Sequence, residues 1–166
     1  MPGRIVAVLL SCAGTDTPKD SDTGGPPPLP EVSAWTGTLH YEIALNDPGE
    51  LLCDLAWTFD GVATEQMCDD CEYGFDLPLT FDPDASLGAE DCLDDLSDAD
   101  DEWLLGYDRD FDVDTEVMWL YSGGAWQVAF YATLDGDTLS FERSFTYEKF
   151  DQTFYYTFDG TGALSP

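Results

Sequence analysis

Apolar side chains recur at every second position along most of the chain from residue 35 onward. Residues 39–45 are the first example, where Leu, Tyr, Ile and Leu alternate with His, Glu and Ala. A period of two places apolar side chains on one face of a β-sheet and polar ones on the other. Aromatic residues, which favour strands, make up 14% of the chain and are concentrated in these segments. The pattern therefore predicts an all-β domain.

Turn signals divide this pattern into about eight strands. Gly123-Gly124 and Asp135-Gly136 are dipeptides typical of tight hairpin turns, and residues 147–151 predict another short connection. Pro78 marks its strand as an edge strand or a bulged strand, because proline has no N–H to donate. The expected strands are 36–46, 51–60, 73–81, 103–109, 115–122, 125–134, 138–147 and 152–159. Residues 83–102 interrupt the alternation and predict a long acidic loop.

The last four strands follow one another as a meander. We expect about eight antiparallel strands that either close into a barrel or pack as a β-sandwich. A meander of this size is similar to lipocalin-like barrels, although Trp35-Thr36-Gly37 is not in the Gly-x-Trp order usual in that family. A barrel of eight strands is either filled by its own side chains or holds one small ligand.

Several large side chains are in phase with the apolar face. Trp57, Trp103, Trp119 and Trp126 are expected inside the domain, where they either fill the core or line a pocket. Arg143 has the same phase, and an inward arginine needs a carboxylate, an aromatic face or a bulge that turns it outward. The alternative is a ligand site in which Arg143 anchors an acidic head group beside Trp57 and Trp126.

The chain has 35 acidic and five basic residues, a formal net charge of −30. Such a surface repels phosphate backbones, so nucleic acid is excluded as a partner. Calcium is the candidate ion, because it takes six to eight oxygen ligands. Acidic residues over 94–102 form one candidate cluster, and the second consists of Asp110, Asp112, Asp114 and Glu116. The second cluster begins like an EF-hand loop, but residues 115 and 121 do not match, and a solvent-facing strand is the alternative.

Catalytic motifs are missing from the sequence. The single histidine, His40, lies on the polar phase of the first strand. There is no nucleophile elbow, no phosphate-binding glycine loop and no His-Glu-x-x-His motif. Two carboxylates are enough for glycoside hydrolysis, but with 35 acidic residues a suitable pair carries no information. We therefore expect a non-enzymatic protein without a resident cofactor.

Four of the five cysteines lie in the β-domain: Cys53, Cys68, Cys71 and Cys92. An even number in an exported domain predicts two disulfides. We expect Cys68 and Cys71 to reach Cys53 and Cys92, because a bridge within Cys-x-x-Cys closes a tiny loop and restricts the unfolded chain little. The same spacing fits zinc or redox chemistry, but the acidic neighbours at 69, 70 and 72 oppose a reactive thiolate.

The N-terminus has the layout of an export signal. Arg4 is followed by six apolar residues and then by Ser11-Cys12, after which a polar stretch rich in Pro, Gly, Ser and Asp extends to residue 34. These features predict a signal peptide over 1–11, a linker over 12–34 and one domain over 35–166. The segment Leu9-Leu10-Ser11-Cys12 resembles a bacterial lipobox, and the overall plan resembles the surface lipoproteins common in deltaproteobacteria.

The lipobox resemblance implies cleavage before Cys12, lipidation of its sulfur and attachment to the cell envelope, either at the outer membrane or on the cell surface. Three functions fit this location. The first is a non-enzymatic module for surface display or protein interaction. The second is a carrier of a small apolar or amphipathic ligand, with Arg143 as anchor. The third is a calcium-stabilised adhesive module.

Overall fold

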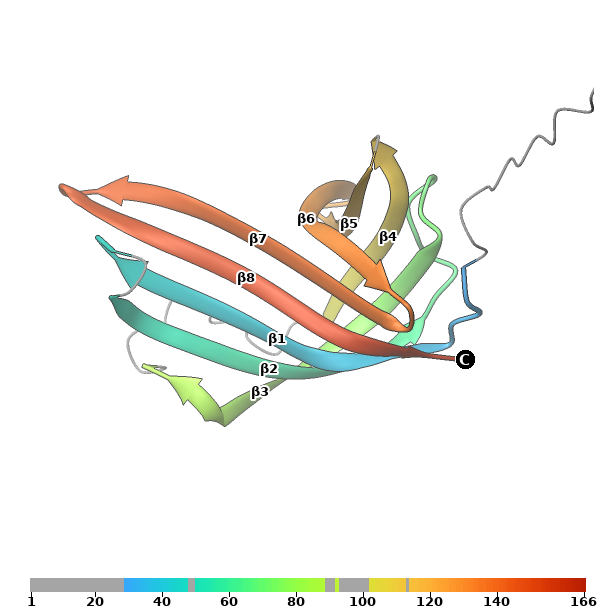
Figure 1. The fold of residues 1–166 in the computed structure, drawn as a ribbon, viewed down its shortest axis with the longest axis horizontal. Coiled ribbons are helices and arrows are strands. Elements are labelled where there is room, and N and C mark those ends of the chain that lie inside the picture. Colours follow the sequence, from blue (N-terminus) through green and yellow to red (C-terminus); the bar gives the residue numbers. More distant parts are fainter. Residues whose placement is uncertain (1–28, 48–49, 89–91, 93–101, 113) are drawn as a thin grey trace, which may run out of the picture.

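Eight antiparallel strands form a closed barrel, which confirms the all-β expectation and selects the barrel over the sandwich. The structure is a computed structural model that describes residues 29–47, 50–88, 92, 102–112 and 114–166. Each strand pairs with its sequence neighbour, and β8 pairs with β1 (Figure 1). The strands are β1 (Ala34–Leu45), β2 (Leu51–Ala63), β3 (Tyr73–Leu87), β4 (Glu102–Asp112), β5 (Thr115–Ser122), β6 (Ala125–Asp135), β7 (Thr138–Lys149) and β8 (Gln152–Ser165).

The last strand is longer than its sequence pattern predicts, since β8 continues to Ser165 instead of ending at residue 159. Two glycines interrupt the apolar alternation there, yet they occupy positions where large rings need space. The ring of Phe141 packs where a side chain at Gly160 would lie, and the indole of Trp35 does the same at Gly162. Glycine is therefore part of the inward face of β8.

The third strand is also longer than predicted. It continues through Leu87, so residues 83–87 belong to a strand and not to the predicted acidic loop. The register of β3 against β2 shifts in this part of the strand. The strand is therefore bulged, as the presence of Pro78 predicted, but the bulge lies after Pro78 and not at it. Ser86 stabilises the bulge: its hydroxyl accepts a bond from the Ala56 N–H at 2.9 Å and donates to the Asp82 carbonyl at 2.7 Å. β3 is not an edge strand, because it also pairs with β4.

One end of the barrel is filled by aromatic rings. Trp35 is fully buried, and the ring centroids of Phe59, Phe75 and Phe141 lie 4.7, 5.2 and 5.7 Å from its own. Burying one such side chain contributes about 1.5–3 kcal/mol, so this cluster is a main source of stability. The predicted filled core is confirmed at this end.

At the other end, β6 and β7 separate. They pair from Tyr131–Glu142 to Asp135–Thr138, whereas β7 and β8 remain paired as far as Lys149–Gln152. In Figure 1, β7 and β8 run together to the left while β6 turns back beside β5. We call the gap between residues 125–130 of β6 and residues 143–149 of β7 the seam. We call this end of the barrel, where β6 and β7 are not paired with each other, the open end.

A β-bulge in β6 accompanies the seam. Met118 pairs with Phe130 and Trp119 pairs with Val128, so Ala129 is an extra residue in this ladder. A bulge reverses the alternation of the strand. The unbroken sequence pattern predicted that Trp126 faces inward, and this is wrong: Trp126 lies outside, where it packs against Gly106 on the outer side of β4.

Both ends of the β-domain lie at the filled end of the barrel. Ala34 pairs with Ser165, and the turn between β7 and β8 is at the opposite end of the molecule (Figure 1). The predicted signal peptide, Cys12 and most of the predicted linker lie outside the described residues, as does most of the acidic cluster over 94–102. Within the described part, no helix has the length and apolar character needed to cross a bilayer.

The cysteines form two disulfides, but their pairing differs from the expectation. Cys53 is bonded to Cys92, and Cys68 is bonded to Cys71. The bridge between Cys68 and Cys71 contributes through packing, in addition to any effect on the entropy of the unfolded chain. The Cys71 sulfur lies directly over Gly106, where a residue with a side chain would not fit. Both cysteines of this bridge are buried.

Removal of the two disulfides should have unequal effects on stability. The Cys53–Cys92 bridge spans 39 residues, and its loss (Cys53→Ala with Cys92→Ala) should lower the free energy of unfolding by about 4 kcal/mol. Loss of the local bridge (Cys68→Ala with Cys71→Ala) should cost about 2 kcal/mol or less. Urea unfolding under non-reducing conditions measures both. Equal costs would contradict the assigned roles.

Candidate functional site

An apolar cleft of about 310 Å³ lies beside the seam. This volume is at the lower end of the range for small-molecule sites. Side chains from five strands form its wall, and most of them are aromatic or aliphatic. The lining residues are Trp103, Leu120, Ala129, Phe130, Arg143, Phe145 and Phe158.

Arg143 is the single charged side chain among these lining residues. Its Nη1 donates to the carbonyl of Ala129, the bulged residue of β6, at 3.1 Å. Its guanidinium carbon lies 5.8 Å from the ring centroid of Phe145. Arg143 directly follows Glu142, which forms the last β6–β7 pair with Tyr131. Its hydrogen bond to Ala129 therefore connects β6 and β7 at the point where their backbone pairing ends. The inward phase predicted for Arg143 is therefore observed.

Arg143 has no carboxylate partner within 4.0 Å in the described part of the chain. This is unexpected in a protein with 35 acidic residues and five basic ones. A guanidinium has five N–H donors arranged to bind an oxyanion. One of these donors is used by Ala129, and the exposed position of Arg143 makes the group accessible to a ligand from solution.

The two tryptophans predicted to accompany Arg143 lie elsewhere. Trp57 faces the interior, but its ring packs against Phe81 at 5.6 Å and is not part of the cleft wall. Trp126 is on the outer surface, 5.4 Å from the ring of Tyr121. The tryptophan that lines the cleft is Trp103, whose ring stacks on Phe130 at 6.0 Å. Sequence phase had placed Trp103 inside, but nothing local to it distinguished a pocket position from a core position.

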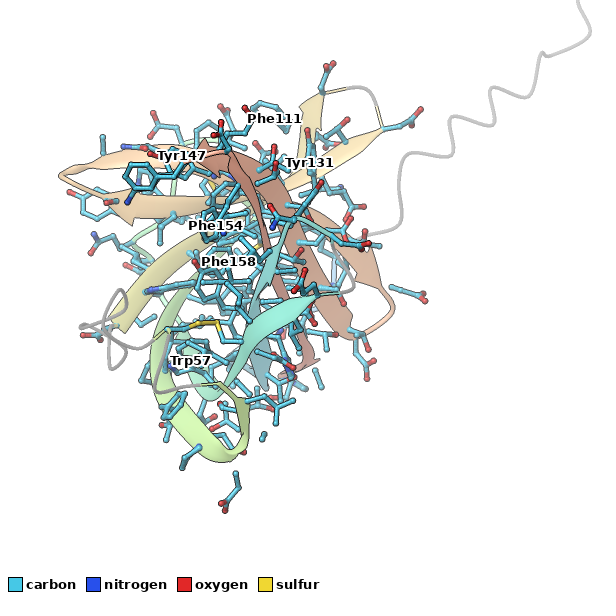
Figure 2. All side chains as sticks on the ribbon, turned by 90° about the vertical axis from the view of Figure 1, so that its left-hand side faces the viewer. Trp57, Phe111, Tyr131, Tyr147, Phe154 and Phe158 are labelled. Atoms are coloured by element: carbon cyan, nitrogen blue, oxygen red, sulfur yellow. A yellow bond between two sulfur atoms is a disulfide. The ribbon has the colours of Figure 1, made fainter. Side chains whose placement is uncertain are left out.

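Rings continue from the cleft toward the open end of the barrel. Phe145 and Tyr156 stack with centroids 4.8 Å apart and planes 8° apart, and Phe154 lies 6.4 Å beyond Tyr156. Figure 2 looks into this end: Phe154 and Phe158 lie between the surrounding strands, with Trp57 below them. The rings provide a wide apolar surface next to one basic group, which suits an amphipathic ligand.

The predicted calcium ligands do not converge. Within the described residues, no three His, Cys, Asp or Glu side chains are placed to hold one metal ion. Glu116 is engaged inside the barrel, where it accepts bonds from the Tyr107 hydroxyl at 3.0 Å and the Leu134 N–H at 2.8 Å. The Asp110 carboxylate is largely exposed and lies 3.9 Å from Arg109, and Asp112 and Asp114 are exposed as well.

The buried position of Tyr107 and its contact with Glu116 raise the pKa of the Tyr107 hydroxyl. Burial has the largest effect, and the hydrogen bond to Glu116 and the charge of that carboxylate act in the same direction. Glu116 therefore works as a structural acceptor for the fully buried Tyr107.

A second depression, of about 380 Å³, lies on the outer face over β6, β7 and β8. Glu142 and Asp159 stand directly opposite each other on β7 and β8 at its edge. Burial raises the pKa of Asp159, the charge of His40 lowers it, and the charges of Asp54 and Glu142 raise it. His40 lies on the outer face as predicted, with its Nδ1 3.3 Å from the Asp54 carboxylate.

The fold and the cleft define a class of protein: an eight-stranded up-and-down β-barrel with an aromatic cleft at its open end. No protein-family model matches the chain, and neither a curated protein nor a solved structure shows significant similarity to it. The chemistry of the cleft is therefore the main guide to function.

The charge of Asp159 should make the protein less stable as the pH rises. Because the folded-state pKa is raised, the folded protein retains a proton on Asp159 that the unfolded chain loses, and the contribution of this carboxyl to stability is greatest below about pH 3.9. Asp159→Asn removes this charge and the repulsion from Glu142. At neutral pH it should raise the free energy of unfolding by about 0.5 kcal/mol.

The gain from Asp159→Asn should disappear in acid, where the wild-type carboxyl is protonated in both states. Chemical denaturation across the pH range measures this difference. Asp60→Asn, on the exposed outer face of β2, is the matched control and should show no comparable gain. A gain that persists unchanged in acid would argue against this electrostatic cause.

Proposed function

We propose that this chain is a non-enzymatic lipoprotein of the bacterial cell envelope whose barrel binds a small apolar or amphipathic ligand, with Arg143 as anchor. The observation that carries the proposal is the cleft itself, an apolar wall that includes one accessible guanidinium without a carboxylate partner among the described residues. A folded interior needs apolar side chains to be covered, and rings such as Phe145, which is 43% exposed, lack that cover.

The envelope location is supported by two features. The lipobox-like segment ends at Cys12, and the two disulfides suit an oxidising compartment. A tether at Cys12 would enter the domain at the filled end of the barrel, since Ala34 pairs with Ser165 there. The open end would then point away from the attachment point, toward solvent and its ligands.

Surface display for protein interaction is the second candidate. It is favoured by large apolar side chains on the outer surface, such as Tyr131, which is 66% exposed, and Phe111 at 46%. A calcium-stabilised adhesive module stays a prediction, and the melting temperature with and without a chelator would test it. We expect no nucleic-acid partner, because a net charge of −30 repels phosphate backbones.

Binding of a neutral hydrophobic dye tests the carrier function. N-phenyl-1-naphthylamine should bind the purified domain saturably with increased fluorescence. Leu120→Trp fills the cleft from β5 and should weaken binding about tenfold or more, because the ligand loses buried apolar area. Val128→Trp adds the same ring to the outer face of β6 and is the control. Binding that is absent, or equally weak in both variants, would leave the display module as the better proposal.

The mass of the protein extracted from membranes tests the location. It should correspond to a chain that begins at Cys12, with added acyl groups and with four thiol hydrogens fewer because of the two disulfides. Cys12→Ser should abolish acylation and release the protein from the membrane fraction. Recovery of the wild-type chain with its initiator methionine and free thiols in the soluble fraction would refute the proposal.

A further inference from the structure

The inner face of β7 and β8 continues beyond the cleft, past the point where β6 stops pairing with β7. Past the last β6–β7 pair, both strands extend for several residues, and β8 stays paired with β1 as far as Leu45–Phe154. Phe145 and Tyr147 on β7 stand opposite Tyr156 and Phe154 on β8. We call these four side chains the ring ladder. β6 pairs with β7 no further than Tyr131–Glu142, and it turns away from this part of β7 (Figure 1).

The ring ladder is preorganised but incompletely covered. The rings of Phe145 and Tyr156 are stacked with their centroids 4.8 Å apart. Next to them, the ring of Tyr41 stacks on that of Phe158 with centroids 4.2 Å apart. Phe145 and Tyr147 nevertheless remain 43% and 54% exposed. Rings held in one orientation with exposed faces favour a bound apolar chain, because little conformational entropy is lost when the ligand binds.

Charge is distributed unevenly along this surface. Arg143 lies at its inner end, next to the cleft, and the ladder itself contains no charged residue. The distance along β7 from Arg143 to Tyr147 is four residues, which at about 3.3 Å per residue is about 13 Å. One cation followed by an apolar path of this length matches a molecule with an anionic head and one extended chain.

We propose that the ligand is a single-chain amphiphile with an oxyanion head, a carboxylate or a phosphate, bound with its head on Arg143 and its chain along the ring ladder. This inference rests on the proposed carrier function and adds the class and the orientation of the ligand. The head group takes guanidinium donors that the Ala129 carbonyl does not use. The surrounding acidic surface is screened beyond about 8 Å at physiological salt, so the contact with Arg143 decides the preference.

Competition against the neutral dye tests the head group. The probes are dodecanoate, dodecyl phosphate and dodecanol, which share one chain length. At least one of the two anions should compete about tenfold or more better than the alcohol, because a charged hydrogen-bonded head replaces a neutral one. Arg143→Gln should remove this preference, and Arg143→Lys, which keeps the charge, should retain most of it. The better anion identifies the head-group chemistry.

Chain length tests the path along the ring ladder. Among saturated carboxylates, affinity should rise up to about fourfold for each added methylene until the chain spans the ladder. Tyr147→Ser with Phe154→Ser should weaken binding of the twelve-carbon acid but leave the eight-carbon acid little changed. Tyr131→Ser removes an exposed ring from the outer face of β6 and is the control, expected to change neither.

The two proposals fail in different ways. If the dye binds but dodecanol competes as well as both anions, or if Arg143→Gln leaves the preference intact, the ligand class is wrong and the carrier function stands. If the ladder variant affects both chain lengths equally, the orientation is wrong. If neither the dye nor any probe binds, the carrier function itself is refuted.

Discussion

Closure of β1 against β8 is the constraint on which the rest of the barrel depends. The two strands pair along the full length of β1, from Ala34–Ser165 to Leu45–Phe154, and so join the two ends of the domain. Closing so long a loop costs conformational entropy. The burial of Trp35 among rings from three other strands offsets this cost at the filled end. Glycines on β8 leave the space that these rings occupy.

The bulge at Ala129 determines which side chains of β6 face the interior near the open end. It reverses the alternation of β6, brings Ala129 inside and leaves the Ala129 carbonyl available to Arg143. Beyond that point β6 pairs with β5 alone, while β7 and β8 continue together. The cleft and the seam therefore lie next to this irregularity.

The acidic composition acts mainly through the outer face. Glu142 and Asp159 face each other across β7 and β8, and the pKa of Asp159 is raised, first by burial and to a lesser extent by the charges of Asp54 and Glu142. Such a surface favours solubility and discourages contact with anionic polymers. At the cleft, in contrast, Arg143 is the one charged residue of the lining.

The sequence by itself determined the fold class, the number of strands and most of their boundaries, because a period of two is a local property of a half-buried strand. It also determined the inward phase of Arg143. Only the tertiary structure decided barrel closure, the pairing of the cysteines, the outward position of Trp126 and the extension of β8 through its glycines. Each of these depends on contacts between residues distant in sequence. Periodicity does not report such contacts, since a bulge, or a glycine beneath a distant ring, breaks it without a local signal.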